Sequence, residues 1–343
     1  LARKGHEVMI YKGIDPSEKE EKVQVEKNLT IWYLPMKHLG AHGFMDCKNL
    51  DPQLKALFCF GDQQIFLPHV YRWCRRRRIP FAAYVGTAHS LDSNFKSKVM
   101  NALFAAGTLR IYKKNPVLAK TSAAKEELRQ LGVPHAVIAP VGLDTAVLKK
   151  NIPADEKMRL RKEHGFEADD VILCNVSRLS WEKRPLELID LFLQVKGKKK
   201  FKLIIVGNGP LEEELNEKIR KNGLEKEVKI YPNVPYEKMW EIYEMSDHYL
   251  NMNKGEIFGM AIMEAVYYKT SVAAIRALGP SVTLKDMKGH KLCENDDEMA
   301  EWITGPYPSE KDLQESSEKM AATFTWDRCA DAFLQASSEK SSR

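Results

Sequence analysis

The sequence predicts an α/β protein with two domains, each built on a parallel sheet covered by helices. Two observations lead to this fold class. Short β-branched runs alternate with amphipathic segments along most of the 343 residues, and strands that alternate with helices form parallel sheets. The chain is also long enough, and with 44% hydrophobic residues apolar enough, to bury two separate cores.

The strands and helices follow from the apolar runs and their spacing. In the first domain we expect strands at 6–11, 29–35, 80–86, 116–121 and 136–140. In the second domain we expect them at 171–177, 201–207, 227–232, 248–252 and 271–275. Helices are predicted at 122–131, 185–195, 210–222 and 236–245, and again from residue 308 onward.

The domain boundary is marked by a break in this alternation. Residues 144–168 are polar and charged and contain no β-branched run, so we interpret them as a linker and a short helix. The expected domains are 1–145 and 146–325, with a C-terminal helix and tail at 326–343 that packs back toward the first domain. Residues 1–4 look like the end of a helix, with Gly5 as its C-cap. We therefore expect that a strand, a loop and most of a helix precede this sequence in the intact domain.

Composition restricts the classes of protein that fit. The net charge of +6 is modest, and the six cysteines form no Cys-x-x-Cys pair, so neither a zinc site nor a redox motif is indicated. Free cysteines within apolar runs fit a reducing, cytoplasmic setting. No apolar run approaches the roughly 20 residues that span a bilayer.

Ligands of open α/β sheets bind at the carboxyl ends of the strands, so the loops there are the first place to look. Arg178 and Lys183 lie in the loop after the strand at 171–177, and Pro185 suits the first turn of the next helix. Two cations beside a helix start could bind a diphosphate, each charge-assisted bond contributing ~1.5–3 kcal/mol. The alternative is that both are ordinary loop cations.

A glycine turn follows the next strand. Gly207, Asn208 and Gly209 lie in the sequence LIIVGNGP, and glycine permits a ligand to approach the backbone closely. The turn lacks the third glycine of the dinucleotide fingerprint. A simple tight turn is therefore the stronger interpretation when this motif is taken alone.

The segment KGEIFGMAIMEAV places two carboxylates around a helix start. Glu256 lies in the loop, the helix begins near Phe258 and Gly259, and Glu264 lies a little over one turn inside it. The N–H groups of Gly259 and Met260 are then free to bind an anion. A nucleotide-sugar offers sugar hydroxyls, a diphosphate and a ribose diol in such an order. Alternatively, Glu256 only favours the helix dipole, worth ~0.3–1 kcal/mol, and Glu264 is a surface residue.

Together these motifs resemble the retaining glycosyltransferases of family 4, which have the GT-B fold of two Rossmann-like domains facing across a cleft. Three motifs carry the resemblance: Glu256 and Glu264 with seven residues between them, the loop from Ser177 to Lys183, and the turn from Val206 to Pro210. The resemblance covers nearly the whole chain from residue 5. It is greatest with bacterial members that build surface polysaccharides.

The resemblance implies roles for the charged residues. Arg178 and Lys183 would neutralise the leaving diphosphate, in place of a metal ion. Glu256 would bind the donor sugar and Glu264 the ribose. His89, after the strand at 80–86, matches a family position near the reacting sugar, although a lone loop histidine is more often structural.

The remaining positions that match the family would bind the nucleotide-sugar through their backbone or side chains. They are Phe258, Gly259, Met260, Gly207 and Asn208. No metal and no cofactor is expected. One departure from the family pattern is Lys269, which stands where a glycine usually ends the helix and where φ > 0 is favoured.

The leading hypothesis is therefore a metal-independent hexosyltransferase that uses a nucleotide-diphosphate sugar, expected to be a UDP-sugar. Its acceptor would be a saccharide or a lipid-linked molecule, and no nucleic acid partner is indicated. A sugar-nucleotide epimerase of the same architecture is the second enzyme hypothesis. A catalytically degenerate binding subunit is the alternative that is not an enzyme.

Two basic runs remain outside these motifs. Residues 66–78 combine five arginines with Phe66, Tyr71 and Trp73, a pattern that suits either an anionic bilayer surface or a core helix with a basic solvent face. The run at 196–200 is interpreted as a solvated loop. The expected location is thus the cytoplasm, with peripheral contact at the inner face of the membrane as a hypothesis.

Overall fold

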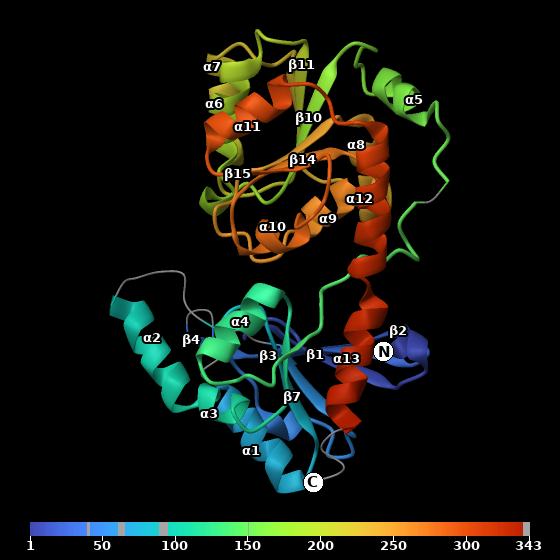
Figure 1. The fold of residues 1–343 in the computed structure, drawn as a ribbon. Helices are drawn as coiled ribbons and strands as arrows, with labels where there is room; N and C mark the ends of the chain where they lie inside the picture. Colours follow the sequence, from blue (N-terminus) through green and yellow to red (C-terminus); the bar gives the residue numbers. More distant parts are fainter. Residues whose placement is uncertain (40–41, 61–65, 89–94, 150, 339–343) are drawn as a thin grey trace. The chain divides into compact units, whose positions relative to one another are not determined.

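The chain folds into two compact units, each with its own core. The computed structural model describes residues 1–39, 42–60, 66–88, 95–149 and 151–338 (Figure 1). One unit contains Leu1–Pro140 together with Asp327–Arg343, and the other contains Val141–Trp326. The chain therefore passes from the first unit into the second and returns to the first with its last helix.

The second unit is built on one six-stranded parallel sheet with the order β12-β11-β10-β13-β14-β15. Its strands are β10 (Val171–Val176), β11 (Phe201–Val206), β12 (Val228–Tyr231), β13 (His248–Asn251), β14 (Ser271–Ile275) and β15 (Lys291–Cys293). The order runs one way from β10 to β12 and the other way from β13 to β15. The carboxyl ends of β10 and β13 therefore form the topological switch point, where open α/β sheets bind ligands.

Helices cover both faces of this sheet. They are α5 (Glu156–Glu163), α6 (Pro185–Val195), α7 (Glu212–Lys221), α8 (Met239–Met245), α9 (Met260–Tyr267), α10 (Leu278–Thr283), α11 (Asp296–Thr304) and α12 (Glu310–Thr323), with short 3-10 turns η3 (Trp181–Lys183) and η4 (Tyr236–Lys238). Alternate residues of β10 enter opposite cores: Ile172 and Cys174 pack with α8 and α9, and Leu173 packs with α6, α7 and α11. Burial on both faces explains the continuous apolar strands of the sequence.

The first unit contains three smaller sheets. Their strands are β1 (Val8–Ile14), β2 (Glu21–Glu26) and β3 (Leu29–Pro35); β4 (Lys37–Leu39) and β5 (His42–Phe44); and β6 (Leu57–Phe60), β7 (Phe81–Val85), β8 (Val117–Ala119) and β9 (Val137–Ile138). The four-stranded sheet is parallel, whereas β2 runs antiparallel to β3. The helices are η1 (Ala2–Lys4), η2 (Cys47–Asn49), α1 (Leu67–Arg77), α2 (Phe95–Ala106), α3 (Thr108–Tyr112), α4 (Ser122–Gln130) and α13 (Trp326–Ser338).

The last helix contributes to the core of the first unit. Phe333 of α13 packs against Phe58, Phe60 and Tyr84, with ring centroids 4.6, 5.8 and 5.2 Å away. Lys4 reaches Asp331 of the same helix at 2.9 Å. Aromatic packing with strands β6 and β7 thus holds the C-terminal helix in place.

The α/β class with parallel sheets is confirmed, and most predicted elements are present. Strand β3 and helix α6 have the expected bounds, and Gly5 caps η1 with φ 84°. Strand β2 was not predicted, because its charged sequence gives an almost fully exposed edge strand. Strands β6 and β15 have four and three residues, too few for a clear period.

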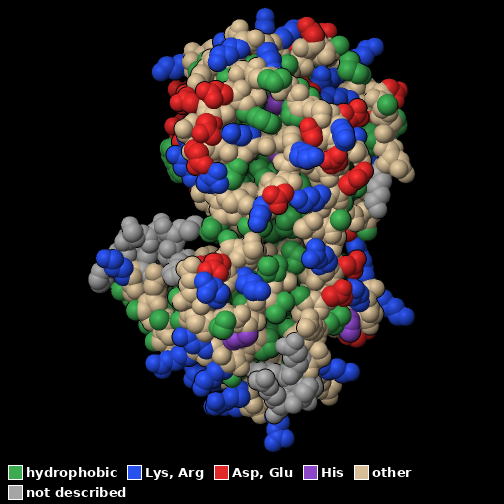
Figure 2. All heavy atoms as spheres, viewed as in Figure 1, with side chains coloured by type: hydrophobic (Ala, Val, Ile, Leu, Met, Phe, Trp, Pro, Cys, Tyr) green, Lys and Arg blue, Asp and Glu red, His purple; other side chains and the backbone are tan. Residues whose placement is uncertain are grey.

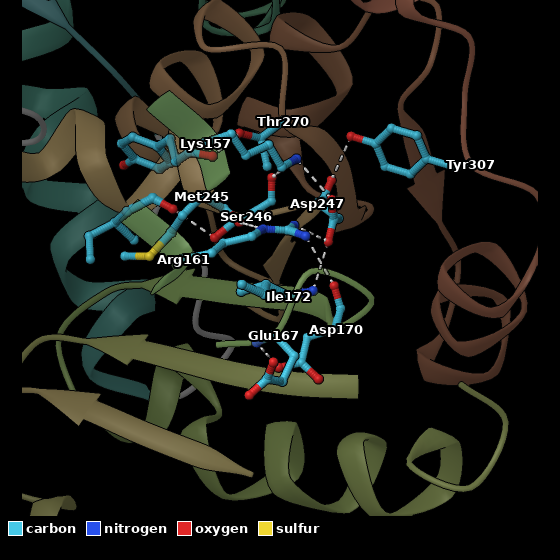
Figure 3. A network of polar contacts seen from close by, with 12 residues as sticks. Lys157, Arg161, Glu167, Asp170, Ile172, Met245, Ser246, Asp247, Thr270 and Tyr307 are labelled. Carbon is cyan, nitrogen blue, oxygen red and sulfur yellow. Dashed lines mark hydrogen bonds and ion pairs between the residues drawn. The ribbon is translucent and has the colours of Figure 1, made fainter. Parts of the chain in front are cut away.

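A buried charge network joins the amino ends of β10 and β13 (Figure 3). Asp247 accepts hydrogen bonds from the Ile172 N–H (2.8 Å), from Arg161 (2.6 Å) and from Lys157 (2.9 Å). Burial raises the pKa of Asp247, but its two cations and the backbone donor outweigh that and lower it overall. The carboxylate therefore stays ionised and fixes these two strand ends together.

The neighbouring His248 makes stability depend on pH. Its side chain is 2% exposed, and burial lowers its pKa to about 4. Between pH 6.5 and 4 the unfolded chain binds a proton that the folded chain does not, so stability present above pH 6.5 is lost as the pH falls. The loss is up to ~1.4 kcal/mol per pH unit.

His248→Phe should flatten the slope of unfolding free energy against pH in urea titrations between pH 7 and 5. The exposed His6→Phe variant is the control, and equal slopes for His248→Phe and the parent would contradict this.

Lys269 occupies a backbone conformation that favours glycine. Its φ is 59°, and the N–H groups of Lys269 and Thr270 bond the carbonyls of Val266 and Ala265 at 3.1 and 2.9 Å. This is the Schellman end of a helix, as the sequence predicts for this position.

Relieving this strain should stabilise the second unit. We expect Lys269→Gly to raise the unfolding free energy by ~0.5–1 kcal/mol. Lys269→Ala retains a Cβ and should bring no such gain. Thermal melts of both variants give the comparison, and equal midpoints for the two would refute the strain argument.

Candidate functional site

The candidate site starts from two adjacent strand ends. Strands β10 and β13 pair in parallel, with Leu173 opposite His248 and Cys174 opposite Tyr249. The loop after β10 carries the predicted cations, and the loop after β13 carries Glu256. Because parallel strands end at the same edge of a sheet, these two loops leave the sheet side by side.

An ion pair joins the two loops. The Lys183 Nζ lies 2.9 Å from Glu256 Oε2, and the two side chains are 21% and 16% exposed. The Asn253 amide donates a second hydrogen bond to the same oxygen at 3.1 Å. Burial raises the pKa of Glu256, but Lys183, Asn253 and the Phe258 N–H outweigh it and hold the pKa below its ordinary value. Glu256 is thus a charged acceptor at the switch point.

Arg178 is placed differently from Lys183. Its side chain is 77% exposed, and it pairs with Glu182 of its own loop at 3.0 Å. Exposed pairs of this kind contribute less than ~1 kcal/mol. The guanidinium is therefore free to exchange Glu182 for a ligand at little cost.

The glycine turn at 207–209 holds the cation loop in position. A Cβ on Gly207 would lie 2.0 Å from the Ser177 carbonyl oxygen, and one on Gly209 would lie 2.5 Å from that of Leu179. The Leu179 N–H bonds the Asn208 carbonyl at 2.8 Å, while the Asn208 side chain donates to Pro232. These glycines permit close packing of two loops. Ligand contact by Gly207 and Asn208 stays a prediction.

The helix after Glu256 begins as expected. Gly259 is the N-cap of α9 with φ 86°, and no side chain caps the helix. Met260 follows it and is 36% exposed. The first N–H groups of the helix have no partner within it, so they suit an anion.

The segment before this helix is braced by the start of α10. A Cβ on Gly279 would lie 2.5 Å from the Phe258 nitrogen, and the Gly279 N–H donates to the Glu256 carbonyl at 2.8 Å. The ring of Phe258 is 7% exposed and packs edge-on against Phe324. Phe258 therefore anchors the loop through its ring, and a direct role in binding stays a prediction.

Glu264 lies deeper, in a separate pocket of the same unit. It is 8% exposed and accepts a hydrogen bond from the Tyr243 hydroxyl at 2.7 Å. Burial raises the pKa of Glu264, and hydrogen bonds from Tyr243 and Tyr236 oppose that rise only in part. The pocket is lined by Val147, Leu148, Lys149, Tyr236, Glu237, Met239, Trp240, Tyr243, Glu264 and Tyr268. Among the described residues, no hydrogen bond connects Glu264 with Lys183 or Glu256.

The structure thus brings two of the predicted residues into direct contact, Lys183 and Glu256. His89 lies outside the described residues. Sequence reasoning missed Asn253, whose Asn-x-Gly spacing is typical of a turn and whose side-chain Oδ1 accepts a hydrogen bond from the Gly255 N–H at 2.9 Å. It also missed Tyr243, for which the sequence offers no signal because it comes from another helix.

Within the part of the chain that the structure describes, no three His, Cys, Asp or Glu side chains gather into a metal-binding group. None of the helices in that part is long and apolar enough to cross a membrane.

The fold of the chain is similar to that of solved GT-B glycosyltransferases. Sucrose-phosphate synthase from Thermosynechococcus elongatus has a similar fold, with a TM-score of 0.72 and 16% identity over 98% of this chain and 89% of that one. Anabaena HepE, in complex with UDP and glucose, has a TM-score of 0.64 and 19% identity, covering 83% and 78%.

The sequence comparison gives the family of the second unit. Residues 156–319 match the family Glycosyl transferases group 1, so this unit contains a group 1 glycosyltransferase domain. D-inositol 3-phosphate glycosyltransferase of Mycobacterium avium (strain 104) is 26% identical over 285 residues, which cover 73% of this chain. The chain spans 62% of that relative's length.

The Lys183–Glu256 pair should couple the two loops energetically. We expect a double-mutant cycle of Lys183→Met and Glu256→Gln to give a coupling of ~1–3 kcal/mol in the free energy of unfolding. Lys183→Met alone leaves a half-buried carboxylate without its cation. Urea unfolding of the four chains measures the coupling. Additive effects would show that the two groups do not interact in solution.

Proposed function

We propose that the protein is a retaining, metal-independent glycosyltransferase that transfers a hexose from a UDP-sugar. The observation that carries this proposal is the Lys183–Glu256 pair at the switch point of the second unit, 2.9 Å across two adjacent loops. At this position a cation could pair with the diphosphate of a nucleotide-sugar, and an ionised carboxylate could accept hydrogen bonds from the hydroxyls of its sugar. The nucleotide is proposed as UDP because a protein of similar fold, Anabaena HepE, is described in complex with UDP and glucose.

The donor would bind by opening this ion pair. Lys183 would turn to the diphosphate, and Glu256 would accept hydrogen bonds from hydroxyls of the transferred sugar. The exposed Arg178, which pairs with Glu182, would join Lys183 on the phosphates. The free N–H groups at Gly259 and Met260 would add donors of fixed direction.

Glu264 would bind the nucleoside in the proposed complex. Its carboxylate, which accepts hydrogen bonds from Tyr243 and Tyr236, retains lone pairs that could accept hydrogen bonds from a ribose diol. Tyr236 and Trp240 line the same pocket and offer apolar surface next to that carboxylate. The buried position raises the pKa of Glu264, and a diol that donates to the ionised form would lower it again.

In the proposed reaction these residues would stabilise the leaving group. As the anomeric bond breaks, negative charge grows on the diphosphate, and Arg178 and Lys183 would offset it. Groups that meet charge in the transition state are worth roughly 10²–10³-fold in rate each. A reaction at the anomeric carbon with retention would give a product of the same anomeric configuration as the donor.

The acceptor would be a saccharide or a lipid-linked alcohol. The named mycobacterial relative acts on an inositol phosphate, which is a polyol, and this supports a hydroxyl acceptor. All six cysteines are free thiols, which suits a reducing compartment. We therefore place the reaction in the cytoplasm, where nucleotide-sugars and membrane-linked acceptors meet.

The test measures UDP release from a panel of UDP-sugars by the intact chain. Arg178→Ala and Glu256→Gln should each lower turnover by roughly 10²–10³-fold, whereas the exposed Lys196→Ala should not change it. A chelator should leave the parent rate intact. Unchanged turnover in both site variants would overturn the assignment. UDP binding in calorimetry without turnover on any donor would instead identify a degenerate, non-enzymatic site.

A further inference from the structure

The first unit has a strong local imbalance of charge that the proposed donor site does not use. Between Gln63 and Lys125 the sequence contains twelve lysines and arginines and one acidic residue, Asp92. The whole chain, in contrast, has 53 basic and 47 acidic residues. This segment contains helices α1, α2 and α3, so its charge is a property of one part of the first unit.

These three helices form one continuous surface. Helix α3 contacts both α1 and α2, and Figure 1 draws the three next to one another. In Figure 2 the lower left of the molecule, where Figure 1 draws α1 and α3, shows basic and hydrophobic side chains and no acidic ones. We call this surface the α1–α3 face.

The exposed cations of this face form no ion pair with a described acidic residue. They are Arg72, Arg75, Arg76, Arg77, Arg78, Lys98, Arg110, Lys113 and Lys114, and two of them contact their own helix, Arg72 through the Pro68 carbonyl at 3.1 Å and Arg77 through the Trp73 ring. The basic run at 196–200 differs, because Lys199 bonds two carbonyls and Lys200 pairs with Asp169 at 2.8 Å. The α1 arginines also meet the helix C-terminus, but its dipole amounts to about half a charge. The α1–α3 face therefore has positive charge left for an external anion.

Exposed apolar side chains are also present on α2, the helix that carries Lys98. Val99 and Leu103 are 43% and 51% exposed and four residues apart on α2, so they share one side of that helix. The aromatic side chains at 66–78 add little exposed apolar surface. Trp73 is 9% exposed beneath Arg77, and Tyr71 and Phe66 are half-buried.

From this geometry we infer that the α1–α3 face binds the surface of an anionic phospholipid bilayer. Unpaired arginines and lysines would meet the lipid phosphates, and Val99 and Leu103 would enter the boundary between headgroups and acyl chains. A soluble polyanion would satisfy the charges but not the exposed apolar pair, so the combination favours the bilayer. The inference does not depend on the donor site, which lies in the other unit.

Vesicle flotation with the full chain tests this inference. Vesicles of phosphatidylcholine mixed with phosphatidylglycerol should bind the protein, and vesicles of phosphatidylcholine alone should not. Arg75→Gln with Arg76→Gln should weaken binding by about five-fold per charge, or roughly thirty-fold for the pair. Lys196→Gln with Lys198→Gln removes the same charge from the second unit and should leave binding unchanged.

The apolar pair has its own test. Val99→Ser with Leu103→Ser should lower binding to the same anionic vesicles several-fold, while Val25→Ser, at another exposed valine of the first unit, should not. Circular dichroism melts establish that each variant is folded. Equal flotation of all variants would overturn the inference. So would binding to soluble polyphosphate as tight as to vesicles and insensitive to the serine changes, which would identify a polyanion site instead. Because flotation needs no nucleotide, its result is separate from that of the UDP-release assay.

Discussion

The pairing of β10 with β13 is the constraint on which the second unit depends. These strands are more than 70 residues apart in the sequence but adjacent in the sheet, and charged side chains hold them at both ends. Asp247 closes the amino ends with the Ile172 N–H and two cations. Lys183 and Glu256 close the loops at the carboxyl ends. These contacts fix the register of the strand pair. The loops that carry the candidate ligand-binding side chains follow its carboxyl ends.

The two charge clusters differ in a way that suits different tasks. Asp247 has donors on both oxygens, and Arg161 beside it is 5% exposed, so removing any partner leaves a buried charge uncompensated, at a cost of several kcal/mol. Glu256 accepts from Lys183, from Asn253 and from the Phe258 N–H, and it is partly open to solvent. The first cluster stabilises the fold, and the second can be rearranged by an incoming molecule.

Much of this organisation could be predicted from the sequence, and the missing parts have identifiable causes. The apolar runs at 171–177 and 248–252 predict buried parallel strands, and the rule for carboxyl ends then places Lys183 and Glu256 at one edge. Tyr243 is different, because its contact with Glu264 depends on how α8 packs against α9, which no local spacing encodes. Glycines 207 and 209 also pack closely against the Ser177 and Leu179 carbonyls, a contact between two loops that no local spacing encodes. For Trp73 the sequence leaves both a membrane-facing position and a core position open, and the burial that the structure shows depends on tertiary packing.

A carboxylate that already neutralises the lysine would, in the proposed function, also act after sugar transfer. The spent nucleotide and Glu256 would compete for the same ammonium group. Once the sugar had left, Glu256 would have no hydroxyls to hold and could recapture Lys183. This internal counter-ion would speed departure of the product and keep inorganic phosphate from occupying the empty site.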